Sequence, residues 1–485
     1  MKGVIIAFIM LLSFSAQAVI VKGNAPSYKG KYVSMLVIED YITYAYRKMD
    51  KQVVDSTGHF TFDVKTDVAL KVIFEIEDKS AIMYIDPNTE EYKIHFPKYT
   101  KHGQHLKDNN IQLVFEDLPD DDLNTLILEY NLRADNFLFG DSMYVIKCIK
   151  ANYIEMYNLC LDDFKDSLID FYKPINNPYF HNYVRYSIAQ LEQLSTGLDI
   201  AVNRINVFNN YIKDKPVLYG NDAYMDFIYQ FYENSLNVPV KGGKDRLYFA
   251  INNNASVDEL NSVLADDHFL KDGRLREIVM IKGLGEVFYS GNYIQNNIIE
   301  MLAHIQKNTV FKENRVIAKN VLKSITRLKK GYPAPNFELV NSKGDSISLK
   351  GYKGKYVYVS FWASWNNNSV AELGIISDLQ KKYGKYIEFV SISVDRNVSE
   401  YKKFMAKNNK YKWDIAHYAG ESGLLAEYSV KSLPEYYLIN PDGNIEQSPA
   451  YRPSPNGNYE SIDVTFFAIK DKLEPKKRIQ IGGKN

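Results

Sequence analysis

Cysteine is almost missing from this sequence, since only Cys148 and Cys160 occur among 485 residues. If one helix carried both, their separation of 12 positions (148 to 160) would correspond to about 18 Å of rise. A disulfide needs Cα atoms within about 7 Å, so a bridge within one helix is excluded. Two buried unpaired thiols and a disulfide across a helical hairpin both remain open. The spacing argues against a catalytic cysteine pair.

The chain also lacks an excess of charge of either sign, because Lys plus Arg and Asp plus Glu each number 59. No net field draws such a protein toward nucleic acid, which we therefore do not expect as a partner. At roughly 100–200 residues per domain, the length predicts two to four domains. No cofactor and no metal site are expected. His102 and His105 lie in a polar, lysine-rich stretch without a nearby cysteine, which favours a surface loop.

Long apolar runs are missing as well, and a membrane-spanning helix takes about 20 residues. The shorter run Val4–Phe14 follows the basic Lys2 and precedes Ala16-Gln17-Ala18, which is the arrangement of a signal peptide. We therefore expect residues 1–18 to be removed by cleavage near Ala18. The mature chain is predicted to be periplasmic or secreted, with no transmembrane segment. No cysteine follows the run, which argues against lipid attachment there.

Residues 19–100 have the pattern of short β-strands separated by turns. His59–Val64 alternates apolar and polar residues directly after the turn signal Asp55–Gly58. Further strands are expected at Tyr32–Val37, Val68–Glu77, Ala81–Ile85 and Tyr92–Phe96. The region is predicted to be a small β-rich sandwich or barrel.

Residues 101–330 change to helical spacing, with apolar side chains at i, i+3 and i+4. Ser256 and Glu259 form a capping box before one apolar run. Helices are expected at Asp122–Leu132, Ser142–Asp170, Tyr183–Gln193, Ala223–Ser235 and Ile298–Gln306. The middle of the chain is therefore predicted to be an α-helical domain.

Residues 331–485 alternate strands and helices. Gly331, Pro333 and Pro335 end the preceding helix and start an extended segment. Strands at Tyr356–Phe361 and Ile387–Val394 are separated by a predicted helix, Ser369–Tyr383. This order predicts an α/β domain that contains parallel strands joined by crossover helices.

Three stretches of this last region are specific. They are Ala334–Leu339 (APNFEL), Lys353–Trp365 (KGKYVYVSFWASW) and Val430–Gly443 (VKSLPEYYLINPDG). Together they resemble the TlpA-like thiol-disulfide oxidoreductases of the thioredoxin superfamily. The resemblance implies a thioredoxin-like fold and a cis-proline at Pro434 that presents backbone groups to a bound peptide. The N-terminal module more loosely resembles the small β domain often fused ahead of such domains, through its strands and Gly58-His59-Phe60.

In the family that this region resembles, a Cys-x-x-Cys motif opens a helix, whose dipole stabilises the reactive thiolate. In this sequence the corresponding positions contain no cysteine, so no catalytic residue is expected. Val370 replaces the arginine that usually follows the motif, whereas Glu372 matches an acid of the family. The four motif positions are Asn366, Asn367, Asn368 and Ser369.

Three interpretations of this altered motif remain open. In the first, Asn366 caps the helix, as Asn does well, and has no other role. In the second, the cap, the helix N-terminus and the Pro434 loop bind an extended peptide or a small anion. A Ser369 nucleophile would need an adjacent base, for which His417 is the candidate. The predicted binding residues are Trp362, Trp365, Asn366, Ser369, Glu372, Leu433 and Pro434.

Two functions are consistent with the sequence. The first is an exported thioredoxin-fold protein, redox-inactive at the usual site, that binds exported proteins or peptides as a scaffold. The alternative is a periplasmic thiol-disulfide oxidoreductase that uses Cys148 and Cys160, or thiols supplied by a partner. The sequence leaves open whether the protein is an enzyme, because fold alone does not establish activity.

Overall fold

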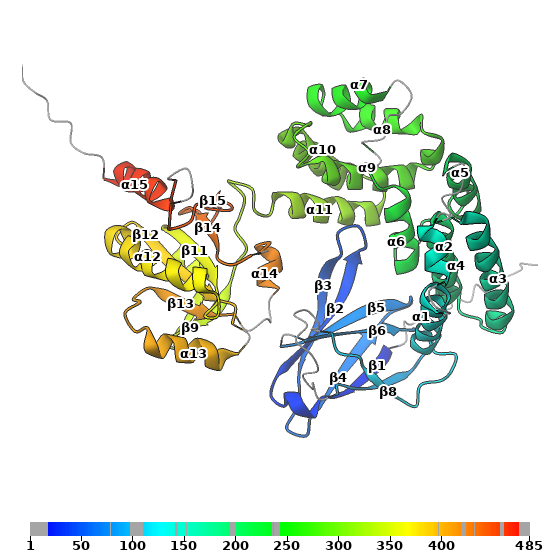
Figure 1. Ribbon diagram of the computed structural model, residues 1–485, viewed down its shortest axis with the longest axis horizontal. Helices are drawn as coiled ribbons and strands as arrows, with labels where there is room; N and C mark the ends of the chain where they lie inside the picture. Colours follow the sequence, from blue (N-terminus) through cyan, green and yellow to red (C-terminus); the bar gives the residue numbers. More distant parts are fainter. Residues whose placement is uncertain are drawn as a thin grey trace, which may run out of the picture. The chain divides into compact units, whose positions relative to one another are not determined.

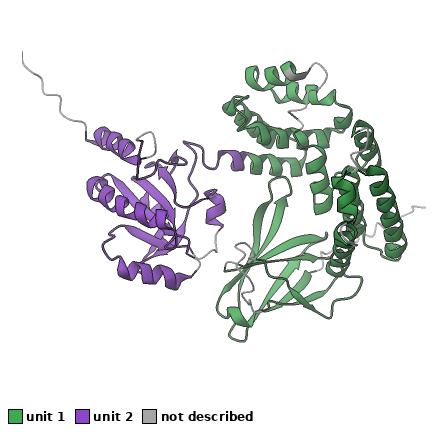
Figure 2. Ribbon diagram, viewed as in Figure 1, with its two compact units in different colours: residues 1–321 green, residues 322–485 purple. Residues whose placement is uncertain are grey.

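The computed structural model describes residues 18–77, 79–97, 110–140, 144–151, 153–194, 200–234, 236, 243–395, 397–418, 423–430, 432–455 and 460–474. The chain divides into two compact units, unit 1 (Met1–Val321) and unit 2 (Leu322–Asn485), which Figure 2 distinguishes. The predicted signal peptide and the His102–His105 stretch lie outside the described residues, apart from Ala18. Within the described ranges, no helix is both long enough and apolar enough to cross a bilayer.

Unit 1 begins with two four-stranded sheets (Figure 1). The strands are β1 (Ala18–Asn24), β2 (Tyr32–Asp40), β3 (Ala45–Val53), β4 (His59–Lys65), β5 (Leu70–Ile76), β6 (Lys79–Ile85), β7 (Glu91–His95) and β8 (Val114–Glu116). One sheet has the order β4-β1-β7-β8, in which β1 runs parallel to β7. The other has the order β3-β2-β5-β6 and is antiparallel throughout.

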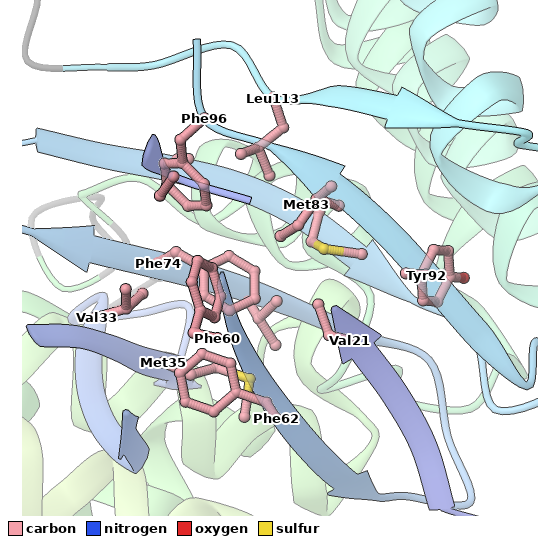
Figure 3. Close-up of a cluster of buried hydrophobic side chains, with 14 of the residues drawn as sticks. Val21, Val33, Met35, Phe60, Phe62, Phe74, Met83, Tyr92, Phe96 and Leu113 are labelled. Atoms are coloured by element: carbon pink, nitrogen blue, oxygen red, sulfur yellow. The ribbon is translucent and has the colours of Figure 1, made fainter. Parts of the chain in front are cut away.

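The two sheets share one hydrophobic core, which Figure 3 shows in close-up. In β4 the side chains of Phe60, Phe62 and Val64 are buried while the intervening ones are exposed, because successive residues of a strand face opposite sides. Phe62 packs against Phe74 of the other sheet, with ring centroids 5.6 Å apart. The β-rich N-terminal region is therefore a sandwich, as predicted.

Three strands of this sandwich were not expected from the sequence: β1, β3 and β8. The clearest case is β3, none of whose side chains is fully buried. It lies at a sheet edge beside β2 and carries Arg47, Lys48 and Lys51. Charged edge strands of this kind limit unwanted pairing with other chains. Because such a strand has no alternation of apolar and polar residues, the sequence pattern does not predict it.

The rest of unit 1 is helical. Its helices are α1 (Leu123–Phe139), α2 (Tyr144–Lys150), α3 (Ile154–Tyr172), α4 (Pro178–Gln193), α5 (Ile200–Tyr211), α6 (Asp222–Phe231), α7 (Gly243–Tyr248), α8 (Val257–Ala265), α9 (Gly273–Val287), α10 (Gln295–Asn308) and α11 (Lys312–Thr326). The boundary between the units falls within α11. The Ser256 hydroxyl accepts a hydrogen bond from the Glu259 N–H (3.2 Å), which is one half of the predicted capping box. The other half is not formed, because the Ser256 N–H donates to the main-chain oxygen of Ala250 (2.9 Å) and the Glu259 carboxylate accepts from the Asn254 amide (2.7 Å).

The continuous helix expected over Ser142–Asp170 was wrong, because α2 ends at Lys150 and α3 begins at Ile154. Neither glycine nor proline lies at the break, and apolar residues continue on both sides of it. The sequence carries only weaker stop signals there, namely Asn152 at the break and Lys147 and Lys150 in the last turn of α2, and the apolar spacing outweighed them. Because of the break, Cys148 and Cys160 lie on different helices.

Helix α9 was also not expected, and its glycines serve close packing. A Cβ at Gly283 would lie 2.5 Å from the Cγ of Leu236, well inside van der Waals contact. Only glycine allows the Leu236 side chain to approach the helix this closely. Gly283-Leu284-Gly285 is thus part of a buried helix.

Unit 2 is built on a seven-stranded sheet of order β10-β9-β13-β12-β11-β14-β15. Its central strands β11, β12 and β13 are parallel, and β14 pairs antiparallel with β11. The strands are β9 (Glu338–Asn341), β10 (Ser346–Ser348), β11 (Tyr356–Trp362), β12 (Ile387–Ser393), β13 (Asp414–His417), β14 (Glu435–Ile439) and β15 (Ile445–Gln447), and the helices are α12 (Asn367–Tyr383), α13 (Val398–Lys407), α14 (Leu424–Glu427) and α15 (Ile462–Leu473).

Strand β11 is buried on both faces of this sheet. Tyr358 and Trp362 belong to the core that includes α12 and α15, whereas Val359 belongs to the core that includes α14. Helices therefore cover both faces, which is the usual condition for parallel strands. The predicted multidomain organisation is confirmed, with a β-rich N-terminal region, a helical middle and a C-terminal α/β fold.

Candidate functional site

The segment Asn366–Ser369 lies where β11 ends and α12 begins. The Asn366 side chain accepts a hydrogen bond from the Ser369 N–H (2.9 Å) and so caps α12. Asn367 and Asn368 are exposed in the first turn. Asn366 is therefore the N-cap residue of α12. Helix N-termini present unpaired N–H groups and a partial positive charge, so polar acceptors are favoured in front of this turn.

The two tryptophans beside the motif have different environments. Trp362, the last residue of β11, is 1% exposed and packs against the Phe404 ring with centroids 5.0 Å apart. Trp365 is 62% exposed. An exposed indole next to a helix N-terminus is a large apolar surface, and such residues are frequent in binding sites. Of this pair, only Trp365 is accessible to a ligand.

The proline loop borders the same edge of the sheet. The Leu433–Pro434 peptide bond is cis, as expected. Glu435, the first residue of β14, pairs with Phe361 near the end of β11. Pro434 therefore lies next to the segment that leads from β11 to Trp365 and Asn366, and both Leu433 and Pro434 are half-buried.

Ser369 is not an accessible nucleophile. Its side chain is 1% exposed, and within the described part of the chain its hydroxyl has no hydrogen-bond partner. The candidate base, His417, is engaged elsewhere, since its Nε2 lies 2.7 Å from the main-chain oxygen of Asp395. A carbonyl oxygen only accepts, so Nε2 carries the proton there. The arrangement of base and nucleophile that a hydrolase needs is not formed.

Glu372 also points inward rather than toward a ligand. Its carboxylate is paired with Arg452 at 3.0 Å and accepts the Ser454 N–H at 3.0 Å, as well as the Ser454 hydroxyl. The side chain is 4% exposed. Glu372 thus anchors the segment that follows β15 onto α12.

The structure divides the seven predicted binding residues into two groups. Trp365, Asn366, Leu433 and Pro434 are exposed or half-buried around the N-terminus of α12. The remaining three, Trp362, Ser369 and Glu372, are buried beneath them.

One residue of this site was missed by the sequence analysis. Asp395 follows β12, is 1% exposed, and accepts hydrogen bonds from the Ser364 N–H (3.0 Å) and the Ser364 hydroxyl (2.8 Å). It also accepts from the Ser393 hydroxyl at 2.7 Å. Asp395 thereby fixes the residue that precedes Trp365. The available signal was its position, because functional side chains gather at the carboxyl ends of parallel strands.

The two cysteines lie in unit 1. Cys148 of α2 is buried and Cys160 of α3 is half-buried, and both are free thiols. They belong to the same small hydrophobic cluster. Burial, and then the neighbouring Cys148, raise the pKa of the Cys160 thiol. A raised pKa leaves less thiolate, which is the reactive form.

A helix that starts at the end of a central parallel strand, with a proline loop beside it, defines a thioredoxin-like protein. Residues 331–448 match the AhpC/TSA family. The thiol-disulfide oxidoreductase ResA of Bacillus cereus is 32% identical over 120 residues, which are 24% of this chain and 68% of that protein. Through this C-terminal region, the chain belongs to the AhpC/TSA family of thioredoxin-like thiol-disulfide oxidoreductases.

Other similar proteins cover the same part of the chain. Thioredoxin-like protein YneN of Bacillus subtilis is 29% identical over 119 residues, or 24% of this chain and 70% of that protein. Among solved structures, the thioredoxin domain of a thiol-disulfide oxidoreductase from Bacteroides vulgatus aligns at 25% identity, with a TM-score of 0.26. That alignment covers 29% of this chain and 98% of that domain.

Proposed function

We propose that the protein is an exported thioredoxin-fold module that binds extended polypeptide segments without thiol-disulfide exchange. The observation that carries the proposal is the lack of sulfur at Asn366 and Ser369, the positions at which the family resemblance places the two cysteines. Thiol-disulfide exchange begins with attack by a thiolate, and neither side chain contains sulfur.

Binding groups remain at the site although the sulfur is lost. Trp365 offers an exposed indole, and the Leu433–Pro434 loop lies at the adjacent sheet edge. The first turn of α12 adds the exposed amides of Asn367 and Asn368. An extended peptide can satisfy its backbone groups at such a loop while one apolar side chain covers the indole. Exported proteins or peptides are therefore the proposed partners.

The proposed location is the periplasm or the extracellular space. It rests on the signal-peptide pattern Lys2, Val4–Phe14 and Ala16-Gln17-Ala18. A scaffold that acts on exported polypeptides needs to be in the same compartment.

The alternative, exchange chemistry at Cys148 and Cys160, is less well supported. The thiol of Cys160 has a raised pKa, and Cys148 is buried. Reactive cysteines instead have a lowered pKa in an electropositive, accessible environment. These thiols have the features of structural cysteines.

The test uses a labelled, tryptophan-free peptide whose cysteines have been carboxymethylated, so that it carries no reactive sulfur. We expect saturable binding by fluorescence anisotropy and at least a tenfold loss of affinity in Trp365→Ala, since aromatic anchors commonly contribute about 2 kcal/mol. Phe467→Ala is the matched control, because Phe467 is 55% exposed on α15 of the same unit. Absence of saturable binding, or equal losses in both variants, would contradict the proposal.

A further inference from the structure

A groove in unit 1 is separate from the thioredoxin-like site. It lies along α3, α4 and α5 and has a volume of about 700 Å³. In this part of the chain α3 packs against α4 and α4 against α5, as Figure 1 shows. Small-molecule sites commonly have volumes of about 300–1,000 Å³, so the groove is large enough for a ligand.

The floor of this groove is apolar. Leu168 and Ile169 come from α3, and Val184 and Ile188 come from α4. Ile169 is 66% exposed, so an aliphatic side chain meets water in the groove. Covering this surface with an alkyl chain removes apolar area from water, which is favourable in proportion to the area.

The positive charges on the rim of the groove outnumber the negative ones. Lys165 is neutralised by Glu192 at 2.9 Å and by Asp162 at 3.2 Å. Arg185 donates to the main-chain oxygen of Asn210 at 2.7 Å, which leaves its charge without a carboxylate.

Lys173, at the C-terminal end of α3, is exposed on the same rim. Neither Lys173 nor Arg185 forms an ion pair with another residue in the described ranges. The side chain of His181 also lines the groove, and its Nε2 donates to the main-chain oxygen of Ile175 at 2.7 Å. The rim therefore has a net positive charge beside the apolar floor.

We propose that this groove binds a free anionic amphiphile, with a single alkyl chain on the floor and a carboxylate at Arg185 and Lys173. A guanidinium matches a carboxylate with two parallel hydrogen bonds, which gives the head group a defined position. A peptide helix fits less well, because a helix about 10 Å in diameter would fill 700 Å³ in under two turns. The size and the charge of the groove both favour the smaller ligand.

Calorimetric titration of the full chain with monomeric dodecanoate tests this proposal. We expect saturable binding that weakens on shortening the chain to decanoate and octanoate, by up to about fourfold per CH2, which corresponds to about 0.8 kcal/mol. Dodecyltrimethylammonium, which carries the same chain with the opposite charge, should bind at least tenfold more weakly. Equal affinity for both head groups would overturn the proposal.

Substitutions then locate the site. Lys173→Glu and Arg185→Gln should each weaken dodecanoate binding at least tenfold. Lys150→Glu should leave it unchanged, because Lys150 is exposed on α2 and does not line the groove. Circular dichroism checks that each variant is folded. If Arg185→Gln unfolds the protein, Lys173→Glu still tests the proposal, because the Lys173 side chain is exposed. Binding of only an acidic peptide or only anionic vesicles, or binding unaffected by Lys173→Glu, would overturn the assignment.

Discussion

Replacing Asp395 with Asn should loosen the segment that carries Trp365. The carboxylate is 1% exposed and accepts hydrogen bonds from the N–H and hydroxyl of Ser364 and from the hydroxyl of Ser393. An amide of the same shape has only one acceptor oxygen and turns an NH2 group toward these donors. The Ser364 N–H cannot reorient, whereas the two hydroxyls can.

The magnitude follows from the type of bond that is lost. A hydrogen bond to a charged group contributes about 1.5–3 kcal/mol, and at least one such bond is lost with the carboxylate charge. We expect a destabilisation of about 3 kcal/mol in the free energy of unfolding of unit 2. For a unit of this size that corresponds to a fall in Tm of about 6–12 °C.

The assay is urea unfolding of the full-length protein followed by tryptophan fluorescence. All three tryptophans, Trp362, Trp365 and Trp413, lie in unit 2, so the signal reports this unit alone. Asp442→Asn is the matched control, because Asp442 is an exposed acid of the same unit and surface substitutions usually change stability by less than about 0.5 kcal/mol. Equal effects of Asp395→Asn and Asp442→Asn would refute the assigned role of Asp395.

Three further results are expected. Ser369→Ala removes a buried hydroxyl that has no hydrogen-bond partner in the described part of the chain, so the urea midpoint should rise by the equivalent of about 1 kcal/mol. A clear fall in the urea midpoint would contradict the burial of an unpaired Ser369 hydroxyl. Alkylation of Cys160 by iodoacetamide near neutral pH should be slower in the folded than in the urea-unfolded protein, because its pKa is raised; equal rates would be contrary to this expectation. Burial raises the pKa of Tyr172, Tyr183 and Tyr401 to about 12, whereas unfolded tyrosine titrates near 10. Above about pH 10 the unfolded state therefore loses protons before the folded state does, and the free energy of unfolding should fall progressively up to about pH 12. Phenolate absorbance and urea unfolding, measured together at each pH, test this expectation. A constant free energy of unfolding over that range would argue against the raised tyrosine pKa values.

The thioredoxin-like region was the most predictable part of the chain from sequence. Strand β11 alternates between two cores, and its motif continues directly into a helix capped by Asn366. The signals are local there: a continuous apolar strand, an N-cap residue and a proline before β14. The site itself was located through the resemblance of Lys353–Trp365 and Val430–Gly443 to the TlpA-like family.

Other features depend on contacts between distant residues, which local patterns do not report. Strand β3 is held by pairing with β2 rather than by apolar side chains of its own. Trp362 and Trp365 look equivalent in the sequence, but the strand ends between them, so one is buried and the other exposed. Asp395 contacts Ser364 only because β11 and β12 are adjacent in the sheet.

The break between α2 and α3 illustrates a different failure. Apolar spacing continues through it without Gly or Pro, so the pattern favoured a single helix that would have kept the two cysteines far apart. In the structure, Cys148 and Cys160 share a cluster across the two helices. The local signals at the break, Asn152 and the lysines of the last turn of α2, are weak beside the apolar spacing, so the pattern alone does not show where the helix ends.

We propose that the site combines a capped helix N-terminus and a cis-proline loop with the absence of the two sulfur atoms that thiol-disulfide exchange requires. Reduction of insulin disulfides by dithiothreitol, measured with the wild-type protein and with the double variant Asn366→Cys/Ser369→Cys, tests it most directly. We expect the wild-type protein to give the rate of the protein-free control and the double variant to accelerate the reaction. Acceleration by wild type, or an inactive but folded double variant, would contradict it.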